Sequence, residues 1–321
     1  MTESEKIKKI VILGGGTGLA TLLRGLKKYP VDLTAVVTVA DDGGSSGRLL
    51  DEYDIPPPGD VRNVMAALSD VEPLIESMFQ YRFSSSEDLK GHSLGNLMLA
   101  ALTDITGDFA RAVEQMSRVL NIKGKVLPAA NQRITLHAEL EDGTIVTGES
   151  KIPVYGRKIQ RVYMTPEEVE PLPETVAAIM AADIVIFGPG SLYTSILPTI
   201  LVKAIREAVL TCNAKKVYIC NLTTQAGETY RYTASQHVQA LYEHAGKAFI
   251  DTILLNNADF SSYFNDGPPW PVLNDHSELE KLVPNIVMKD IVAFIDGGIR
   301  HKSDEVAEWI IEYMNESTEK K

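Results

Sequence analysis

Three glycine-rich runs carry the residue types that could bind a phosphorylated ligand. The first, Gly14-Gly15-Gly16-Thr17-Gly18, follows the apolar run Ile7 to Leu13 and precedes leucines that are spaced as on one face of a helix. A strand that ends in glycines and opens a helix directs backbone N–H groups and the helix dipole to one spot, which favours a phosphate. We expect Gly16 to lie beside that phosphate, with no room for a branched side chain.

The first run departs from the two familiar phosphate-binding sequences. A Walker A loop contains Gly-Lys-Ser/Thr, and none follows Gly18. The Gly-x-Gly-x-x-Gly pattern of dinucleotide sites is incomplete as well, because Leu19 or Thr21 stands where its last glycine belongs. A plain tight turn that requires a positive φ is therefore the alternative to a phosphate site.

The second run joins carboxylates to glycines and hydroxyls. It reads Asp41-Asp42-Gly43-Gly44-Ser45-Ser46-Gly47-Arg48 and follows the apolar run Leu33 to Val39. Asp41 is placed to bind a ribose hydroxyl, and Asp41 together with Asp42 could hold a divalent metal such as Mg²⁺ through oxygen ligands. The serine hydroxyls and Arg48 are suited to phosphate. An acidic turn with a purely structural role is the alternative.

The third run, Gly188-Pro189-Gly190-Ser191, repeats the arrangement after the apolar run Ile184 to Phe187. Open α/β sheets bind their ligands in a crevice at the carboxyl ends of the strands. Because all three runs follow predicted strands, we expect a single crevice with polar walls and place the ligand-binding residues there.

Two serines match a hydrolase motif without its context. Gly91-His92-Ser93-Leu94-Gly95 has the letters of the Gly-x-Ser-x-Gly nucleophile elbow, but a polar loop precedes it where the elbow needs a strand. Gly43 to Gly47 has the same letters, and its context is also incomplete. We therefore predict no catalytic residue and expect Ser93 to flank a helix. The six histidines lack the spacings of a zinc site.

The elements around these runs predict an α/β fold. Strand, glycine turn, helix and strand over the first forty residues form a βαβ unit, which implies parallel strands and a right-handed crossover. The pattern is helical over residues 60–121 and turns to strand over residues 125–164, with a hairpin at Asp142-Gly143. We predict a single domain over residues 1–321. It is a Rossmann-like, doubly wound, mostly parallel sheet with a helical segment and a small β insertion at about 125–164.

Composition excludes several classes of protein. The chain has 321 residues, a formal net charge of −12 and an apolar fraction of 45%. This apolar fraction excludes a disordered chain, and the negative charge argues against general nucleic-acid binding, which needs surplus Lys and Arg. No run approaches the roughly 18 apolar residues of a membrane span. We expect a cytoplasmic protein in which Cys212 and Cys220 stay reduced.

Longer motifs make the chain resemble the YvcK branch of the CofD-like family. They run from about residue 10 to 300 and so cover nearly the whole chain. Beyond the glycine-rich runs they are Leu22-Leu23-Arg24-Gly25-Leu26, Pro57-Pro58-Gly59-Asp60-Val61-Arg62-Asn63, Gly95-Asn96-Leu97, Leu192-Tyr193-Thr194-Ser195-Ile196-Leu197-Pro198, Asn221-Leu222-Thr223-Thr224-Gln225 and Asp296-Gly297-Gly298-Ile299-Arg300.

The resemblance implies a Rossmann-like fold that binds a nucleotide-containing ligand. Proteins of the YvcK branch, called gluconeogenesis factors, are implicated in cell shape and in growth on gluconeogenic carbon sources, and they bind UDP-sugars. The CofD branch, 2-phospho-L-lactate transferase, moves a phospholactyl group from a nucleotide donor onto a deazaflavin and uses Mg²⁺. The extension Gly43 to Arg48 departs from the CofD branch, which argues against transfer to a flavin-like acceptor.

These observations lead to one hypothesis and two rivals. We expect a regulatory, homo-oligomeric protein that binds a UDP-sugar with its diphosphate over the first glycine run. The resemblance and the side-chain chemistry place further ligand contacts at Asn63, Asn96, Tyr263 and Arg300. The rivals are a Mg²⁺-dependent transferase of the 2-phospho-L-lactate transferase type and an oxidoreductase that binds NAD through Asp41.

Overall fold

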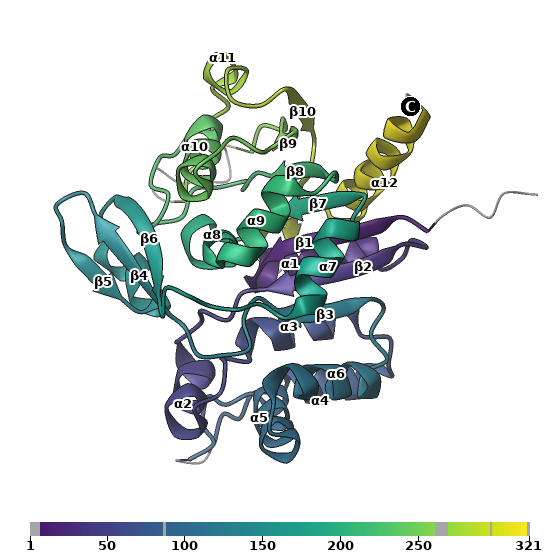
Figure 1. Ribbon diagram of the computed structural model, residues 1–321, viewed down its shortest axis with the longest axis vertical. Coiled ribbons are helices and arrows are strands. Elements are labelled where there is room, and N and C mark those ends of the chain that lie inside the picture. Colours follow the sequence, from purple (N-terminus) through teal and green to yellow (C-terminus); the bar gives the residue numbers. More distant parts are fainter. Residues whose placement is uncertain (1–6, 86–87, 261–268, 296, 320–321) are drawn as a thin grey trace, which may run out of the picture.

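A seven-stranded parallel sheet forms the centre of the molecule (Figure 1). The computed structural model describes residues 7–85, 88–260, 269–295 and 297–319. The strand order is β10-β9-β8-β7-β1-β2-β3, and every neighbouring pair is parallel. The strands are β1 (Lys9–Gly14), β2 (Asp32–Val37), β3 (Lys125–Pro128), β7 (Ile184–Phe187), β8 (Lys215–Ile219), β9 (Thr252–Asn256) and β10 (Asn285–Lys289).

Helices cover the sheet, so its central strands are buried along their length. All four residues of β7 and the five of β1 that follow Lys9 are buried, as expected when helices lie on both faces. Helix α1 contacts α3 and α12, while α9 contacts α7 and α8 in front of the sheet in Figure 1. These helices are α1 (Gly16–Leu26), α3 (Gly59–Leu68), α7 (Pro173–Ala181), α8 (Leu197–Leu201), α9 (Lys203–Thr211) and α12 (Ser303–Glu319). The predicted doubly wound α/β fold is confirmed.

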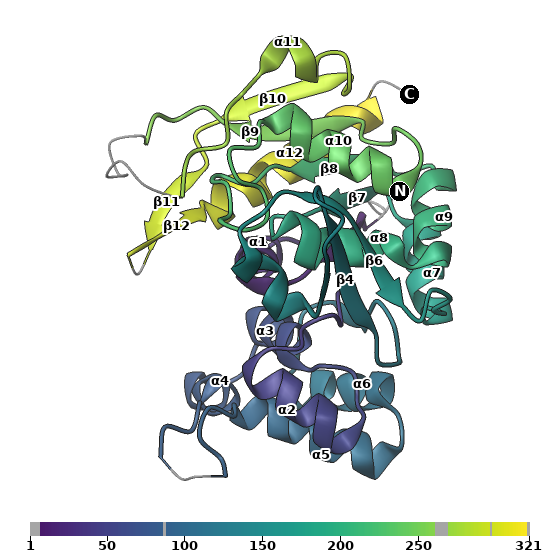
Figure 2. The same cartoon turned by 90° about the vertical axis from the view of Figure 1, so that its left-hand side faces the viewer.

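A helical segment separates β2 from β3 and forms the lower part of the molecule in Figure 2. Besides α3 it contains α2 (Gly44–Tyr53), α4 (Pro73–Gln80), α5 (Leu94–Thr106) and α6 (Phe109–Val119). The predicted helical stretch over residues 60–121 is confirmed. Helix α2 was not predicted, because its first turn consists of glycines and serines, which have low helix propensity.

The β insertion is a separate three-stranded antiparallel sheet with the order β5-β4-β6. It contains β4 (Thr135–Leu140), β5 (Ile145–Thr147), the 3₁₀ helix η1 (Glu149–Tyr155) and β6 (Ile159–Thr165). The predicted hairpin at Asp142-Gly143 joins β4 to β5. The insertion begins later than the predicted residue 125, because Lys125–Pro128 pair with β2 and form the edge of the main sheet.

The C-terminal part contains a small sheet of its own. The apolar run before Gly297 does not join the main sheet. It forms β11 (Val292–Ile295), which pairs with β12 (Gly298–His301) in an antiparallel hairpin of its own. Helix α12 begins at Ser303, after this hairpin.

Two further helices complete the fold among the described residues. They are α10 (Ala234–Ala245), which Thr233 opens with a capping box, and the short α11 (His276–Leu279). The two cysteines, Cys212 and Cys220, are free and buried. No helix in the described ranges has the length and apolar character that crossing a bilayer requires.

Candidate functional site

A cleft of about 410 Å³ lies at the carboxyl ends of β1, β7 and β8, the edge at which open α/β sheets bind ligands. The loops that follow these strands bring together residues that are far apart in the sequence. Eight of the predicted site residues line the cleft: Gly15, Gly16, Thr17, Gly18, Asp41, Gly190, Ser191 and Arg300.

The first and third glycine runs touch each other in the floor of the cleft. A Cβ atom on Gly18 would lie 2.7 Å from the backbone carbonyl oxygen of Pro189, so only glycine lets the two turns come this close. A Cβ atom on Gly15 would overlap a carboxyl oxygen of Asp60. Glycine at these two positions therefore allows the close approach of backbone and carboxyl groups.

Gly16 opens helix α1 with a φ of +67°, a left-handed conformation that favours glycine. Within the protein a Cβ atom there would meet only the Ser195 hydroxyl, 3.8 Å away, so the expectation that a branched side chain has no room beside the phosphate stays a prediction. The constraint is the backbone conformation. The N-cap residue, Gly15, provides no side-chain cap, and the N–H of Gly16 donates to the carboxyl group of Asp60. The start of α1 thus presents backbone donors at the cleft, which suits an anion.

Three carboxyl groups, those of Asp41, Asp60 and Glu149, line the same cleft. Burial, with the Asp41 carboxylate adding to it, raises the pKa of Asp60 to about 7. Burial and then the charges of Asp41 and Asp60 raise the pKa of Glu149 to about 8. Near neutral pH the cleft therefore holds protons that solvent-exposed carboxyl groups would have lost.

A fourth carboxyl group, that of Glu228, is buried and does not line the cleft. It accepts a hydrogen bond from the Thr194 hydroxyl over 3.3 Å and others from the N–H groups of Tyr193 and Thr194. Burial raises the pKa of Glu228 to about 7, and its Oε2 has no partner within the described part of the chain. Glu228 thereby anchors the π-helical turn η2 (Leu192–Ile196), which carries Ser195 into the cleft.

The adjacent aspartates of the second run bind different partners. Asp41 Oδ1 accepts the N–H of Gly43 over 2.9 Å beside the cleft, whereas Asp42 Oδ1 accepts the N–H of Ser150 in the β insertion over 2.8 Å. Within the described ranges, no three His, Cys, Asp or Glu side chains are grouped so that they could hold a metal ion. Carboxylate oxygens have the chemistry that Mg²⁺ prefers, but a Mg²⁺ site on the Asp41–Asp42 pair stays a prediction.

Ser45 and Asn96 belong to a buried polar network between α2 and α5. Asn96 Nδ2 donates to Ser45 Oγ over 3.1 Å, and Ser45 Oγ lies 3.0 Å from His92 Nδ1. The Ser93 hydroxyl accepts the N–H of Asn96 over 3.2 Å and caps α5, so the prediction that Ser93 flanks a helix is confirmed. This network joins α2, whose first turn belongs to the second glycine-rich run, to α5.

The remaining predicted residues lie outside the cleft lining. Arg48 donates to the carbonyl oxygen of Lys90, and Asn63 accepts a hydrogen bond from Arg62. Tyr263 lies outside the described residues. The predicted residues that are described and do not line the cleft are Gly14, Asp42, Ser45, Ser46, Gly47, Arg48, Asn63, Asn96 and Gly188.

Arg300 reaches the cleft by a route that the sequence did not suggest. It lies on β12 of the two-stranded hairpin, rather than in a loop at the end of a main-sheet strand. Its guanidinium is exposed and donates to the carbonyl oxygen of Ile299 over 2.8 Å. The neighbouring His301 donates through Nε2 to the carbonyl oxygen of Cys220, and burial lowers the pKa of His301 to about 4. Arg300 is therefore the one cationic side chain among the described residues that line the cleft.

Several lining residues were missed by the sequence analysis. Three of them lie in motifs that carry the family resemblance, namely Asp60, Asn221 and Gln225. Their place in these motifs was the sequence signal that could have identified them. Gln225 Nε2 donates to Ser191 Oγ over 2.6 Å, which fixes one wall of the cleft. Glu149 carried no sequence signal, because it reaches the cleft only through the folding of the β insertion against the second run.

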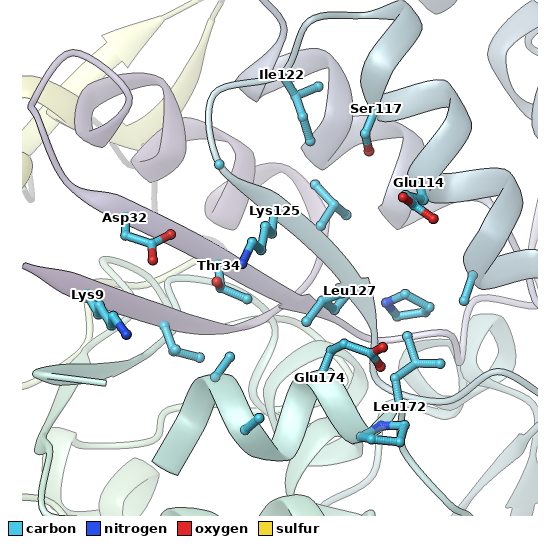
Figure 3. A pocket seen from close by; sticks show the side chains of 18 of the residues that line it. Lys9, Asp32, Thr34, Glu114, Ser117, Ile122, Lys125, Leu127, Leu172 and Glu174 are labelled. Atoms are coloured by element: carbon cyan, nitrogen blue, oxygen red, sulfur yellow. The ribbon is translucent and has the colours of Figure 1, made fainter. Parts of the chain in front are cut away.

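A larger hollow, of about 1100 Å³, lies between α6 and α7 (Figure 3). Lys9, Asp32 and Lys125, the first residues of β1, β2 and β3, line it, and Thr34 and Leu127 project from the same strands in Figure 3. It therefore lies toward the amino ends of the strands and contains none of the glycine-rich runs. Because ligands of open α/β sheets bind at the carboxyl ends, we place the functional site in the smaller cleft.

Comparison with known proteins agrees with the geometry. The sequence model of the family described as 2-phospho-L-lactate transferase CofD matches residues 10–292. The chain belongs to the CofD family. Among CofD-family proteins it is 57% identical to the gluconeogenesis factor of Bacillus subtilis (strain 168), over 96% of this chain and 98% of that protein. It is 54% identical to the gluconeogenesis factor of Halalkalibacterium halodurans, over 96% of this chain and 97% of that protein. These similarities identify the YvcK, or gluconeogenesis-factor, branch of the CofD family.

The fold of this CofD-family chain also matches a solved structure. A crystal structure of a protein from Bacillus halodurans superimposes with a TM-score of 0.93 at 54% sequence identity. The match covers 95% of this chain and all of that one. The arrangement of sheet, helical segment and insertion is thus shared with that relative.

Proposed function

We propose that this CofD-family chain is a cytoplasmic regulatory protein that binds a UDP-sugar in the cleft and supports growth on gluconeogenic carbon sources and cell shape. The name of its relatives, gluconeogenesis factor, supports the role in growth. The observation that carries the ligand class is the start of α1. Its glycine turn, without a side-chain cap on Gly15, lies in one cleft with the guanidinium of Arg300.

The cleft offers each kind of group that a diphosphate and a sugar require. The first turn of α1 supplies backbone donors and the positive end of the helix dipole for the phosphates. Arg300 adds a charged fork of donors, and the Ser191 and Thr223 hydroxyls can pair with sugar hydroxyls. The raised pKa values of Asp60 and Glu149 let these carboxyl groups stay protonated beside an anion, so that they donate hydrogen bonds instead of repelling it.

Calorimetric titration tests this proposal. The panel is UDP-N-acetylglucosamine, UDP-glucose, GTP, GDP and NAD, each with and without Mg²⁺. We expect saturable binding of a UDP-sugar, weakened in Arg300→Ala and unchanged in Arg118→Ala, a control on the distant helix α6. Absence of binding to every nucleotide in the panel would refute the proposal, and preference for NAD would favour a dinucleotide site instead.

A Mg²⁺-dependent transferase is the second candidate, favoured by the transferase description of the matching family and by the carboxyl groups of the cleft. In that case Asp41, with Asp60 or Glu149, would hold the ion, which would neutralise charge on a donor diphosphate. The chain's own residues would orient the donor through the start of α1 and Arg300. Time-resolved product analysis with Mg²⁺ separates the two candidates, since consumption of the nucleotide donor excludes a protein that only binds.

A further inference from the structure

Two aromatic rings and one guanidinium form a cluster at the surface. Tyr230 and Arg231 come from the loop after β8, and Trp270 comes from the segment after β9. The guanidinium carbon of Arg231 is 5.4 Å from the centre of the Trp270 ring and 5.6 Å from that of Tyr230. The two rings meet edge to face with their centres 4.8 Å apart. Tyr230 is 55% exposed and Arg231 is exposed as well. Trp270 is half-buried, so the cluster keeps part of its aromatic surface and its guanidinium open to solvent.

Backbone contacts fix Trp270 beside the loop that lines the cleft. The N–H of Thr224 donates to the carbonyl oxygen of Trp270 over 2.8 Å. Thr223 and Gln225, the two residues on either side of Thr224, both line the cleft. An antiparallel bridge between Thr223 and Pro271 extends the same pairing. The loop after β8 thus lines the cleft with Thr223 and Gln225 and contacts the backbone of Trp270 between them.

Arg231 is held in a conformation that a side chain disfavours. Its φ of +54° lies in the left-handed region, which residues other than glycine, asparagine and aspartate seldom adopt. Such strained positions gather at ligand sites, where the surrounding structure maintains them. The guanidinium stacks on both rings and is exposed, so its N–H groups can donate to a ligand while it stays stacked.

We infer that the cluster of Tyr230, Arg231 and Trp270 is the nucleobase subsite of the cleft and selects a base with carbonyl oxygens on its edge, such as uracil or guanine, over adenine. The inference rests on the proposed nucleotide binding. Aromatic rings and guanidinium planes are the surfaces on which unpaired bases stack. The guanidinium is only a donor, so it pairs with the carbonyl edge of uracil or guanine, whereas adenine offers an amino group there.

The test uses the chain's two tryptophans. Trp309 is buried in α12, so Trp309→Phe leaves Trp270 as the sole tryptophan reporter at the cleft. In this variant, titration with UDP should change the Trp270 emission saturably, with the Kd that calorimetry gives. Trp270→Leu should raise the Kd for UDP by roughly tenfold, a typical effect of losing one stacked base. Tyr81→Leu, at an exposed tyrosine of the helical segment, is the matched control and should leave the Kd unchanged.

Specificity is tested by Arg231→Asn, a substitution that suits the left-handed backbone and so preserves the loop. In this variant the ratio of the Kd for ADP to the Kd for UDP should fall by about tenfold, as expected for one lost bidentate base contact. The ratio of the Kd for ADP to the Kd for GDP should fall by a similar factor.

Three outcomes distinguish the inference from the proposed function. If the parent chain binds no nucleotide, the proposed function fails and the inference with it. If UDP binds but the Trp270 emission stays constant and a folded Trp270→Leu variant keeps its Kd, the inference is overturned and the proposed function stands. If Trp309→Phe does not fold, Arg231→Asn and Tyr230→Leu are made in the parent chain. A raised Kd for UDP in these variants supports the inference, and an unchanged Kd in both overturns it.

Discussion

Removing the guanidinium of Arg300 should weaken binding of a nucleotide sugar without weakening the fold. The side chain is exposed, and its hydrogen bond goes to the carbonyl oxygen of the adjacent Ile299, so the folded state loses little in Arg300→Ala. A charge-assisted contact to a phosphate contributes about 1.5–3 kcal/mol. Since each 1.4 kcal/mol changes Kd tenfold, the variant should bind roughly 10- to 150-fold more weakly.

The assay is calorimetric titration with UDP-N-acetylglucosamine at one fixed salt concentration, together with thermal unfolding of each variant. Arg300→Lys should recover only part of the lost affinity, because an ammonium group lacks the planar fork that binds two phosphate oxygens. Arg118→Ala removes an exposed arginine that pairs with Glu114 on α6, and it should leave Kd unchanged. A folded Arg300→Ala variant with the parent Kd would remove Arg300 from the site.

Three further substitutions test the cleft and its surroundings. The folded-state pKa of Glu149 is raised, so between about pH 4.5 and 8 the folded chain binds more protons than the unfolded one and loses stability as pH rises. Over this range the midpoint of thermal unfolding should fall less steeply in Glu149→Gln than in the parent, and the surface control Glu167→Gln should follow the parent. Gly18→Ala places a Cβ against the backbone of the neighbouring turn and should destabilise the chain by about 1–3 kcal/mol in urea unfolding; an unchanged midpoint would show that the turns can move apart. Ser93→Ala removes the cap of α5 and should cost about 1 kcal/mol by the same measurement, and labelling of Ser93 by a fluorophosphonate probe would contradict its structural role.

The fold could be predicted because its signals are local. Each strand of the first βαβ unit ends at a glycine-rich run, and periodic leucines mark the helix between them. The strand Ile184–Phe187 and the hairpin at Asp142-Gly143 follow from short patterns in the same way. Helix α2 had no such signal, because the residues Gly44 to Gly47 favour turns and only their packing within the helical segment makes them helical.

The residues that line the cleft were harder to predict, because they come together through contacts between distant segments. Asp41 and Asp42 are neighbours in the chain, yet the N–H of Ser150 holds the second carboxylate against the β insertion. The same insertion carries Glu149 to the cleft, over a hundred residues after Asp41. Neither the partner of Asp42 nor the position of Glu149 can be predicted from the sequence, because both depend on how the insertion packs against the second glycine-rich run. Arg300 was predicted at the site, but the structure brings it there on a separate hairpin and not at the end of a sheet strand.

The charges of the cleft indicate how it would attract an anion. The described lining contains one guanidinium against three carboxyl groups, and the whole chain carries a net charge of −12. Long-range attraction therefore cannot bring a diphosphate to the site. The attraction must come from short-range groups, namely the backbone donors at the start of α1, the Arg300 fork and carboxyl groups whose raised pKa values keep them neutral. A site built this way depends on the glycine geometry at Gly15 and Gly18, because a side chain at either position would separate the donors from one another.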